Sequence, residues 1–226
     1  MPTPTAIVHR TPVRPELAGR IHGPGWRLAE PMPVAHYHPR SSGHRPAASA
    51  RLLHDGRCLY ALFVVADDRY VRAAHTEYDS DTYKDSCVEL FVRPAGREGY
   101  FALEVNCAGA FSLRYIEDPT RTANRFAKWT RVDWTQARRI EVATSMPGPV
   151  DPEVPGPITW WVELAWPAEV MEAYCGPLAD LSGQRWTANA FKCGDETSHP
   201  HWGSWAPIGQ ALNFHAPEYF GTIEFE

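Results

Sequence analysis

The sequence predicts an all-β protein: an antiparallel β-sandwich of immunoglobulin or jelly-roll type with one or two short helices. Twenty-one prolines and sixteen glycines divide the 226-residue chain into short segments, which disfavours long helices. About nine short runs have the composition and patterning of strands, with turn residues between them. No long stretch carries the 3.6-residue period of a helix.

The expected elements follow in chain order. Residues 1–25 are rich in proline and are expected to form an extended arm over the core, and residues 26–226 a single sandwich domain. Pro167–Ala173 is expected to form a short helix with proline at its start. Strands are predicted at Ala48–Leu53, Cys58–Ala66, Cys87–Arg93, Gly99–Cys107, Ala110–Tyr115, Arg139–Ser145, Thr159–Trp166, Arg185–Cys193 and Thr222–Glu226.

Three of these segments have distinctive patterns. Cys58–Ala66 is almost continuously apolar, as a central strand is, and Asp67-Asp68 is expected to end it. In Thr159–Trp166, alternate residues place two tryptophans, a valine and a leucine on one face. Met146–Pro157 holds five prolines and is expected to be a loop, not a domain linker, because strand patterns lie on both sides.

Two predicted strands carry polar groups in mid-run. Cys87–Arg93 contains Glu89, and in Gly99–Cys107 the period of two places Glu104 and Asn106 on one face. Phe101, Leu103, Val105 and Cys107 share the opposite face. A strand of this kind has either a solvated face or a polar site on it.

The charge and composition exclude some classes of partner. A net charge of −5 and a pI near 6.1 argue against nucleic acid, whose phosphates need a basic face. No apolar run reaches the ~18 residues of a membrane span. The N-terminus lacks a signal-peptide pattern, so the expectation is a cytoplasmic protein, or an extracellular one if a leader has been removed. The oligomeric state is left open.

Five cysteines are an odd number, so at least one thiol is unpaired or pairs between chains. Cys87, Cys107 and Cys193 lie in apolar strand contexts, and most thiols are therefore expected to be buried and inert. A Cys107–Cys193 disulfide is an open alternative if their two strands are neighbours.

A sugar site needs flat aromatic faces together with groups that bind hydroxyls. Trp202 and Trp205 lie in a loop with glycine and proline, and Tyr83 directly precedes a strand. The alternative is that the tryptophans hold a loop onto the sandwich and that the carboxylates pair with basic side chains, Arg114 and Lys192. The polar candidates are Glu89, Glu104, Asn106, Arg114 and Asn189.

Four segments together resemble the carbohydrate-binding modules of family 9, specifically the stand-alone family 9-like branch: Asp85–Phe91 (DSCVELF), Glu104–Gly109 (EVNCAG), Pro200–Trp205 (PHWGSW) and Asn213–Gly221 (NFHAPEYFG). The resemblance extends from about Trp26 to the C-terminus. It implies a non-catalytic module in which two aromatic side chains clamp a terminal sugar while polar groups bind its hydroxyls.

By this resemblance, Tyr83 is the first clamp, and Trp202 or Trp205 is the second, with Asn189 upstream of them. Glu89 and Asn106 correspond to the polar groups of the two strands. The sequence departs from the family at two positions. Tyr83 stands where the first clamp is otherwise tryptophan, and Glu104 stands where sugar-binding members tend to carry a basic residue.

Metal sites are weakly indicated. Asp79, Asp81 and Asp85 form an acidic region that is either a solvated loop or a calcium site, and the resemblance adds that some relatives bind structural calcium. His199, His201, Cys193 and His215 do not have the spacing of a standard zinc site.

Enzymatic activity is not expected. No G-x-S-x-G motif is present, although Glu89 and Glu104 could in principle act as a glycosidase pair. Two non-catalytic alternatives to sugar binding remain. One is a related sandwich that holds haem through Met and His side chains, and the other is a structural or interaction domain without a ligand.

Overall fold

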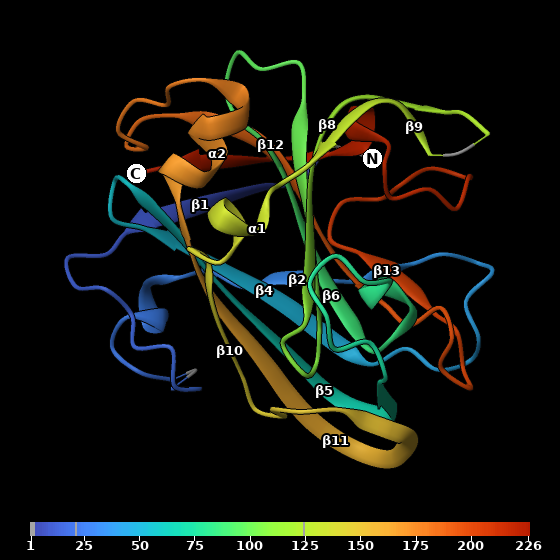
Figure 1. The fold of residues 1–226 in the computed structure, drawn as a ribbon. Coiled ribbons are helices and arrows are strands. Elements are labelled where there is room, and N and C mark those ends of the chain that lie inside the picture. Colours follow the sequence, from blue (N-terminus) through green and yellow to red (C-terminus); the bar gives the residue numbers. More distant parts are fainter. Residues whose placement is uncertain (1–2, 21, 124) are drawn as a thin grey trace.

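The computed structural model describes residues 3–20, 22–123 and 125–226, and it confirms the β-sandwich. Two β-layers cross each other, with β5 and β11 running diagonally through one and β6, β8 and β12 through the other (Figure 1). The strands follow the order β10-β11-β5-β4-β1-β14-β12-β6-β7-β8-β9, in which β1 joins the two layers.

The first layer contains β2 (Met32–Val34), β4 (Ala47–His54), β5 (Cys58–Ala73), β10 (Glu141–Thr144) and β11 (Val150–Pro167). The second layer contains β3 (His36–Tyr37), β6 (Cys87–Arg93), β7 (Tyr100–Asn106), β8 (Phe111–Arg121), β9 (Phe126–Arg131), β12 (Arg185–Cys193), β13 (Trp202–Ser204) and β14 (Gly221–Phe225). The two α-helices are α1 (Trp134–Ala137) and α2 (Ala168–Cys175), and the 3₁₀ turns are η1 (Trp26–Leu28), η2 (Thr82–Lys84) and η3 (Pro217–Tyr219).

The N-terminal segment is not simply an arm over the core, because Thr5–Arg10 forms β1. Its first four residues pair in parallel with β14, and its last two pair in parallel with β4. Ala6 and Val8 point into the core, and burying these side chains favours a paired strand over a loose arm.

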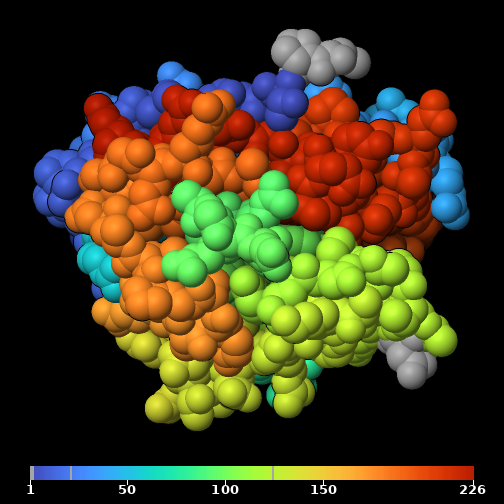
Figure 2. Space-filling view, turned by 90° about the horizontal axis from the view of Figure 1, so that it is seen from above, coloured from blue at the N-terminus to red at the C-terminus, as the bar shows by residue number. Residues whose placement is uncertain are grey.

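The core fills the space between the layers, as the alternation in the sequence predicted. Phe101, Leu103 and Val105 of β7 belong to the same buried cluster as alternate residues of β11, including Trp160 and Trp166. Figure 2 shows one end of the sandwich, where the region of α2 appears in orange. The turn between β6 and β7, in green, lies between this region and the yellow-green β8–β9 hairpin.

Three predicted boundaries were wrong, and at one of them β8 continues past the predicted end at Tyr115 to Arg121. β5 does not end at Asp67-Asp68 but continues to Ala73, because Asp67 adopts a left-handed conformation (φ 55°) that keeps the chain on the sheet. The predicted loop Met146–Pro157 is a strand from Val150 onward. This N-terminal half of β11 pairs irregularly with β5. On the other edge, β10 pairs only with Val162–Ala165 of β11, so among the described residues the prolines of the N-terminal half have no partner strand there.

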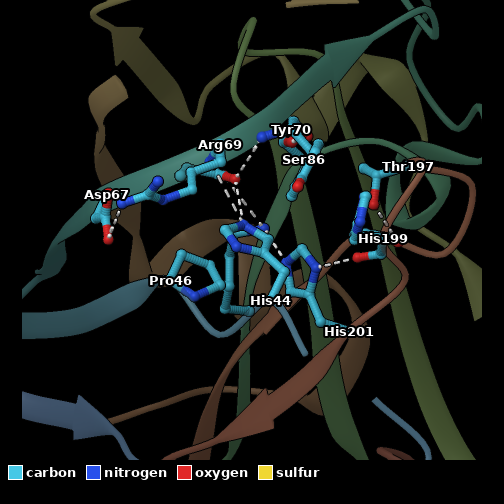
Figure 3. A network of polar contacts seen from close by, with 12 residues as sticks. His44, Pro46, Asp67, Arg69, Tyr70, Ser86, Thr197, His199 and His201 are labelled. Atoms are coloured by element: carbon cyan, nitrogen blue, oxygen red, sulfur yellow. Dashed lines mark hydrogen bonds and ion pairs between the residues drawn. The ribbon is translucent and has the colours of Figure 1, made fainter. Parts of the chain in front are cut away.

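A polar cluster is buried between the layers. The ammonium of Lys192 lies 2.7 Å from His201 Nε2 and 3.7 Å from Asp68 Oδ2. Asp68 also accepts hydrogen bonds from Trp160 Nε1 and His44 Nε2, both at 2.9 Å. Burial alone would raise the pKa of Asp68, but Lys192 and these donors hold it below its usual range. Figure 3 shows the two histidines of the cluster side by side.

All five cysteines are free thiols. The disulfide alternative is wrong, because β6 separates β7 from β12, and Cys107 points into the core whereas Cys193 points outward. Cys87, Cys107 and Cys193 are buried, as expected, and burial raises the pKa of each. Among the described residues, no helix has the length and apolar character needed to cross a bilayer.

Candidate functional site

The outer face of the second layer carries a row of polar side chains. Strand alternation turns Glu89 of β6, Glu104 of β7 and Arg114 of β8 away from the core, while their neighbours Val88, Leu90 and Leu113 point inward. Glu89 lies directly opposite Glu104 across the β6–β7 pair. The two polar strand faces noted in the sequence therefore meet in one place.

A cavity of about 390 Å³ lies over this row. Its rim comes from η2, from the segment around β13, from the loop before η3 and from the β8–β9 hairpin, which gather at one side of the second layer (Figure 1). The lining residues are Asp81, Tyr83, Glu89, Glu104, Arg114, Arg121, Arg125, Phe126, Cys193, Asp195, Trp202, Leu212, Asn213, Phe214 and His215.

Glu104 and Arg114 form a fixed ion pair in the floor. Glu104 Oε1 accepts from Arg114 Nη1 at 3.1 Å, and Oε2 accepts from Ser112 Oγ at 2.9 Å. The other guanidinium nitrogen, Nη2, donates to Asp79 at 3.2 Å. A buried carboxylate and a buried guanidinium held in this way are oriented before a ligand arrives, and this favours specific binding of hydroxyl groups.

Glu89 lies beside this pair, and no described residue forms an ion pair with it. Its side chain is buried, and the hydrogen bond described for it comes from the Cys193 thiol, 3.1 Å from Oε1. Burial and then the charge of Glu104 raise its pKa well above the ordinary glutamate value. Lys192 does not neutralise it, because this ammonium points into the core cluster with Asp68.

One wall of the cavity is built around Asp195. Trp202 Nε1 donates to its Oδ1 at 2.7 Å, and the amide of Asp195 donates to the carbonyl of Tyr83 at 3.3 Å. Burial raises the pKa of Asp195 to about 6, although the Trp202 hydrogen bond opposes this shift. The half-buried rings of Tyr83 and Trp202, both predicted clamps, thus line the same cavity, and Trp202 is bonded to the Asp195 carboxyl group.

The C-terminal loop adds an aromatic wall that the sequence did not assign to the site. Phe214 stacks on Phe191 with 4.1 Å between ring centroids, and His215 shares a 2.9 Å hydrogen bond with the hydroxyl of Tyr100. Asn213 Oδ1 accepts from the backbone of His215 at 3.1 Å and so shapes the turn. These residues lie in the Asn213–Gly221 segment, whose resemblance to the family was the available signal.

Three predicted residues do not line the cavity. Asn106 donates to Asp85 at 2.9 Å and to the carbonyl of His75 at 2.7 Å, so it fixes a loop. Asn189 is bonded to the backbone of Ala206 through both ends of its amide. Trp205 is buried in the core. All three have structural partners that explain their burial.

The acidic region does not assemble a calcium site from the three predicted carboxylates. Asp79 pairs with Arg114 and Arg131, Asp81 with Lys84, and the buried Asp85 with Arg72. Among the described residues they form no group around one point. Calcium binding stays a prediction without a defined ligand set.

The histidine-based zinc site and the haem alternative gain no support from the cavity. His201 points into the core cluster and His199 stacks on Tyr70, with 3.6 Å between centroids, so neither joins Cys193 in the floor of the cavity. Of the described residues that line the cavity, one is a histidine, His215, and none is a methionine that could join it in holding a haem.

The fold and the cavity together define a β-sandwich binding module. Residues 30–225 match carbohydrate-binding family 9, and the chain belongs to this family. It is a carbohydrate-binding module, as the resemblance implied. Among curated proteins, no match was found.

Solved structures share the fold. A crystal structure from Bacteroides uniformis, to which carbohydrate binding is assigned provisionally, covers 100% of both chains with a TM-score of 0.86 and 25% identity. A family 9 module from Caldicellulosiruptor kristjanssonii in complex with cellotriose covers 99% of this chain and 94% of its own, with a TM-score of 0.64 and 16% identity. A family 9 module from the same organism in complex with glucose aligns over 97% of this chain and 95% of its own length, with a TM-score of 0.63 and 16% identity.

Proposed function

We propose that the cavity on the outer face of the second layer binds the end of a carbohydrate chain, without catalysis. The observation that carries this proposal is the combination of a fixed Glu104–Arg114 pair in the floor with aromatic walls above it. The cavity volume lies at the lower end of the ~300–1,000 Å³ typical of small-ligand sites, which suits a chain end better than a long chain.

Each part of the site has a role in this proposal. The rings of Tyr83, Trp202 and Phe214 offer apolar faces to the C–H faces of a sugar. Glu104, Arg114 and Asp195 offer acceptors and donors to its hydroxyls, and Glu89 has an oxygen for which no protein donor is described. A sugar that leaves these buried groups unpaired is disfavoured, and this would give the site its specificity.

The arrangement of Glu89 and Glu104 supports a binding role over hydrolysis. A glycosidase places its two carboxyl groups on opposite sides of the scissile bond. Here the two residues face each other across neighbouring strands in one floor, and Glu104 is committed to Arg114 and Ser112.

Calorimetric titration tests the proposal, with glucose and cellotriose as first probes because they occupy related folds. A glycan array follows if neither binds. For a sugar that binds, Trp202→Ala should lower affinity by about 1–3 kcal/mol, or roughly 5- to 150-fold. Trp134→Ala is the matched control, because this ring is 53% exposed and lies outside the cavity.

If a sugar binds Trp202→Ala and the unchanged protein with the same affinity, the proposed location of the binding site is wrong. The result that contradicts carbohydrate-end binding is a preference for internal segments of a polymer over its ends on the array.

A further inference from the structure

Two thiols and a carboxyl group meet at and just beneath the floor of the cavity, which Cys193 and Glu89 line. Cys87 of β6 lies directly opposite Cys193 of β12 in the antiparallel pair, and Glu89 follows two residues later on the same face of β6. One Sγ atom from each cysteine and one oxygen of Glu89 all lie within 4.8 Å of one another. Three potential ligands are thus held by two central, hydrogen-bonded strands.

The environment of Glu89 independently favours a cation. Its side chain is 4% exposed and lines the cavity, and the bond described for it comes from a thiol, which is a weak donor. The guanidinium of Arg114 in the same floor is already bonded to Glu104 and Asp79. A buried carboxyl group without a basic partner is costly to ionise, and a bound cation would remove this cost.

We propose that Cys87, Cys193 and Glu89 form a binding site for a divalent metal ion of the zinc class, which enters from the carbohydrate cavity. Thiolate ligands select zinc-like ions over calcium and magnesium, which prefer oxygen. With Zn–S near 2.3 Å and Zn–O near 2.1 Å, tetrahedral ligand atoms lie about 3.6–3.8 Å apart. The three ligand atoms lie within 4.8 Å of one another, about 1 Å beyond this spacing at most.

The bond changes on binding are simple. Each thiol and the carboxyl group of Glu89 release their protons to solvent, a metal–sulfur bond forms at each Sγ, and one carboxylate oxygen of Glu89 completes three protein ligands. No electron is transferred. The fourth position faces the cavity, where water or a sugar hydroxyl would occupy it, as in zinc sites that keep one position for an exogenous ligand.

Cobalt(II) added to the reduced full-length protein tests the site without any sugar. One Co²⁺ per chain should bind and give thiolate-to-metal charge-transfer absorption with the visible bands of a tetrahedral ion, and Zn²⁺ should displace it. Cys87→Ala and Cys193→Ala should each abolish the charge-transfer signal of this site. Glu89→Gln, which removes the anionic ligand, should weaken binding at least tenfold.

Cys107→Ala is the matched control, because this buried thiol points to the core side of the sheet and should leave the cobalt spectrum unchanged. Circular dichroism shows whether each variant is folded. A reduced wild-type protein with five reactive thiols after unfolding, but no charge-transfer band with Co²⁺, overturns the proposal without recourse to variants. The same spectrum in the Cys87→Ala/Cys193→Ala double variant also overturns it.

The proposed metal site rests on the same cavity as the proposed sugar site, but each proposal can be refuted without the other. Metal binding is measured in the absence of sugar, and sugar binding is measured after treatment with a chelator.

Discussion

The neutral form of His201 stabilises the buried cluster between the layers, and acid should therefore destabilise the fold. His201 Nε2 accepts from the ammonium of Lys192 at 2.7 Å, and Nδ1 donates to the carbonyl of His199 at 2.9 Å. An added proton would place the imidazolium against this ammonium. Burial and then the charge of Lys192 lower the pKa of His201 to about 3.

The size of the effect follows from linkage. An unfolded histidine titrates near ~6.5, so between that pH and about 3 the unfolded chain binds a proton at this position that the folded chain does not. The stabilisation is fully present above the unfolded pKa. It is lost at up to about 1.4 kcal/mol per pH unit as the pH falls, which amounts to about 2.3 kcal/mol between pH ~6.5 and ~4.5.

Urea unfolding at a series of pH values measures this loss. His201→Gln keeps an acceptor for Lys192 without a titrating ring. The slope of its unfolding free energy against pH should therefore be smaller than that of the wild type, by the equivalent of about one bound proton. His36→Gln, at an exposed histidine, is the control and should keep the wild-type slope. An identical slope in His201→Gln and the wild type would refute the reasoning. His215, whose pKa burial also lowers to about 3, contributes in the same direction in both proteins.

Two further predictions concern packing. Gly221→Ala places a Cβ 2.4 Å from the ring of Trp205 and 2.9 Å from the carbonyl of Pro4, so thermal unfolding should show a loss of about 1–3 kcal/mol. Gly43→Ala, with nothing within 4 Å, should show almost none, and equal losses would contradict the packing argument. A polar thiol reagent should label Cys107, which is buried on the core side of the sheet, only at the rate of unfolding. Rapid labelling of this thiol in the folded protein would show that the sheet opens locally.

The floor of the site could be predicted from the sequence because strand alternation is a local property. The period of two in β7 places Glu104 opposite to Phe101, Leu103 and Val105, and the same period in β6 sets the direction of Glu89. What alternation does not provide is the position along the strand at which a cavity begins. Asn106 shares the face of Glu104, but the loop that contains Asp85 covers it.

The choice between Trp202 and Trp205 depended on a strand that the sequence did not reveal. β13 has only three residues, and Trp202 pairs with Cys193, whose side chain lines the cavity. Directly opposite residues share a face of the sheet, whereas a residue three positions further along points the other way. This places Trp202 at the cavity and Trp205 in the core, as observed.

The pairings of β1 and of the first half of β11 were missed because they depend on distant segments. β1 pairs with the last strand of the chain, about 217 residues away in sequence, and the proline-rich half of β11 lies against the extension of β5. Single-segment patterns carry no information about such partners, and prolines argue against a strand unless one of its edges is known to be free.

The same alternation explains why the site keeps an uncompensated acid. Lys192 and Cys193 are neighbours in β12 and point to opposite faces of one sheet. The lysine reaches Asp68 on the core side, while the thiol reaches Glu89 on the cavity side. A basic side chain only one residue away from the floor is therefore unable to neutralise Glu89, and a ligand that enters the cavity finds a buried carboxyl group still available for a hydroxyl or a cation.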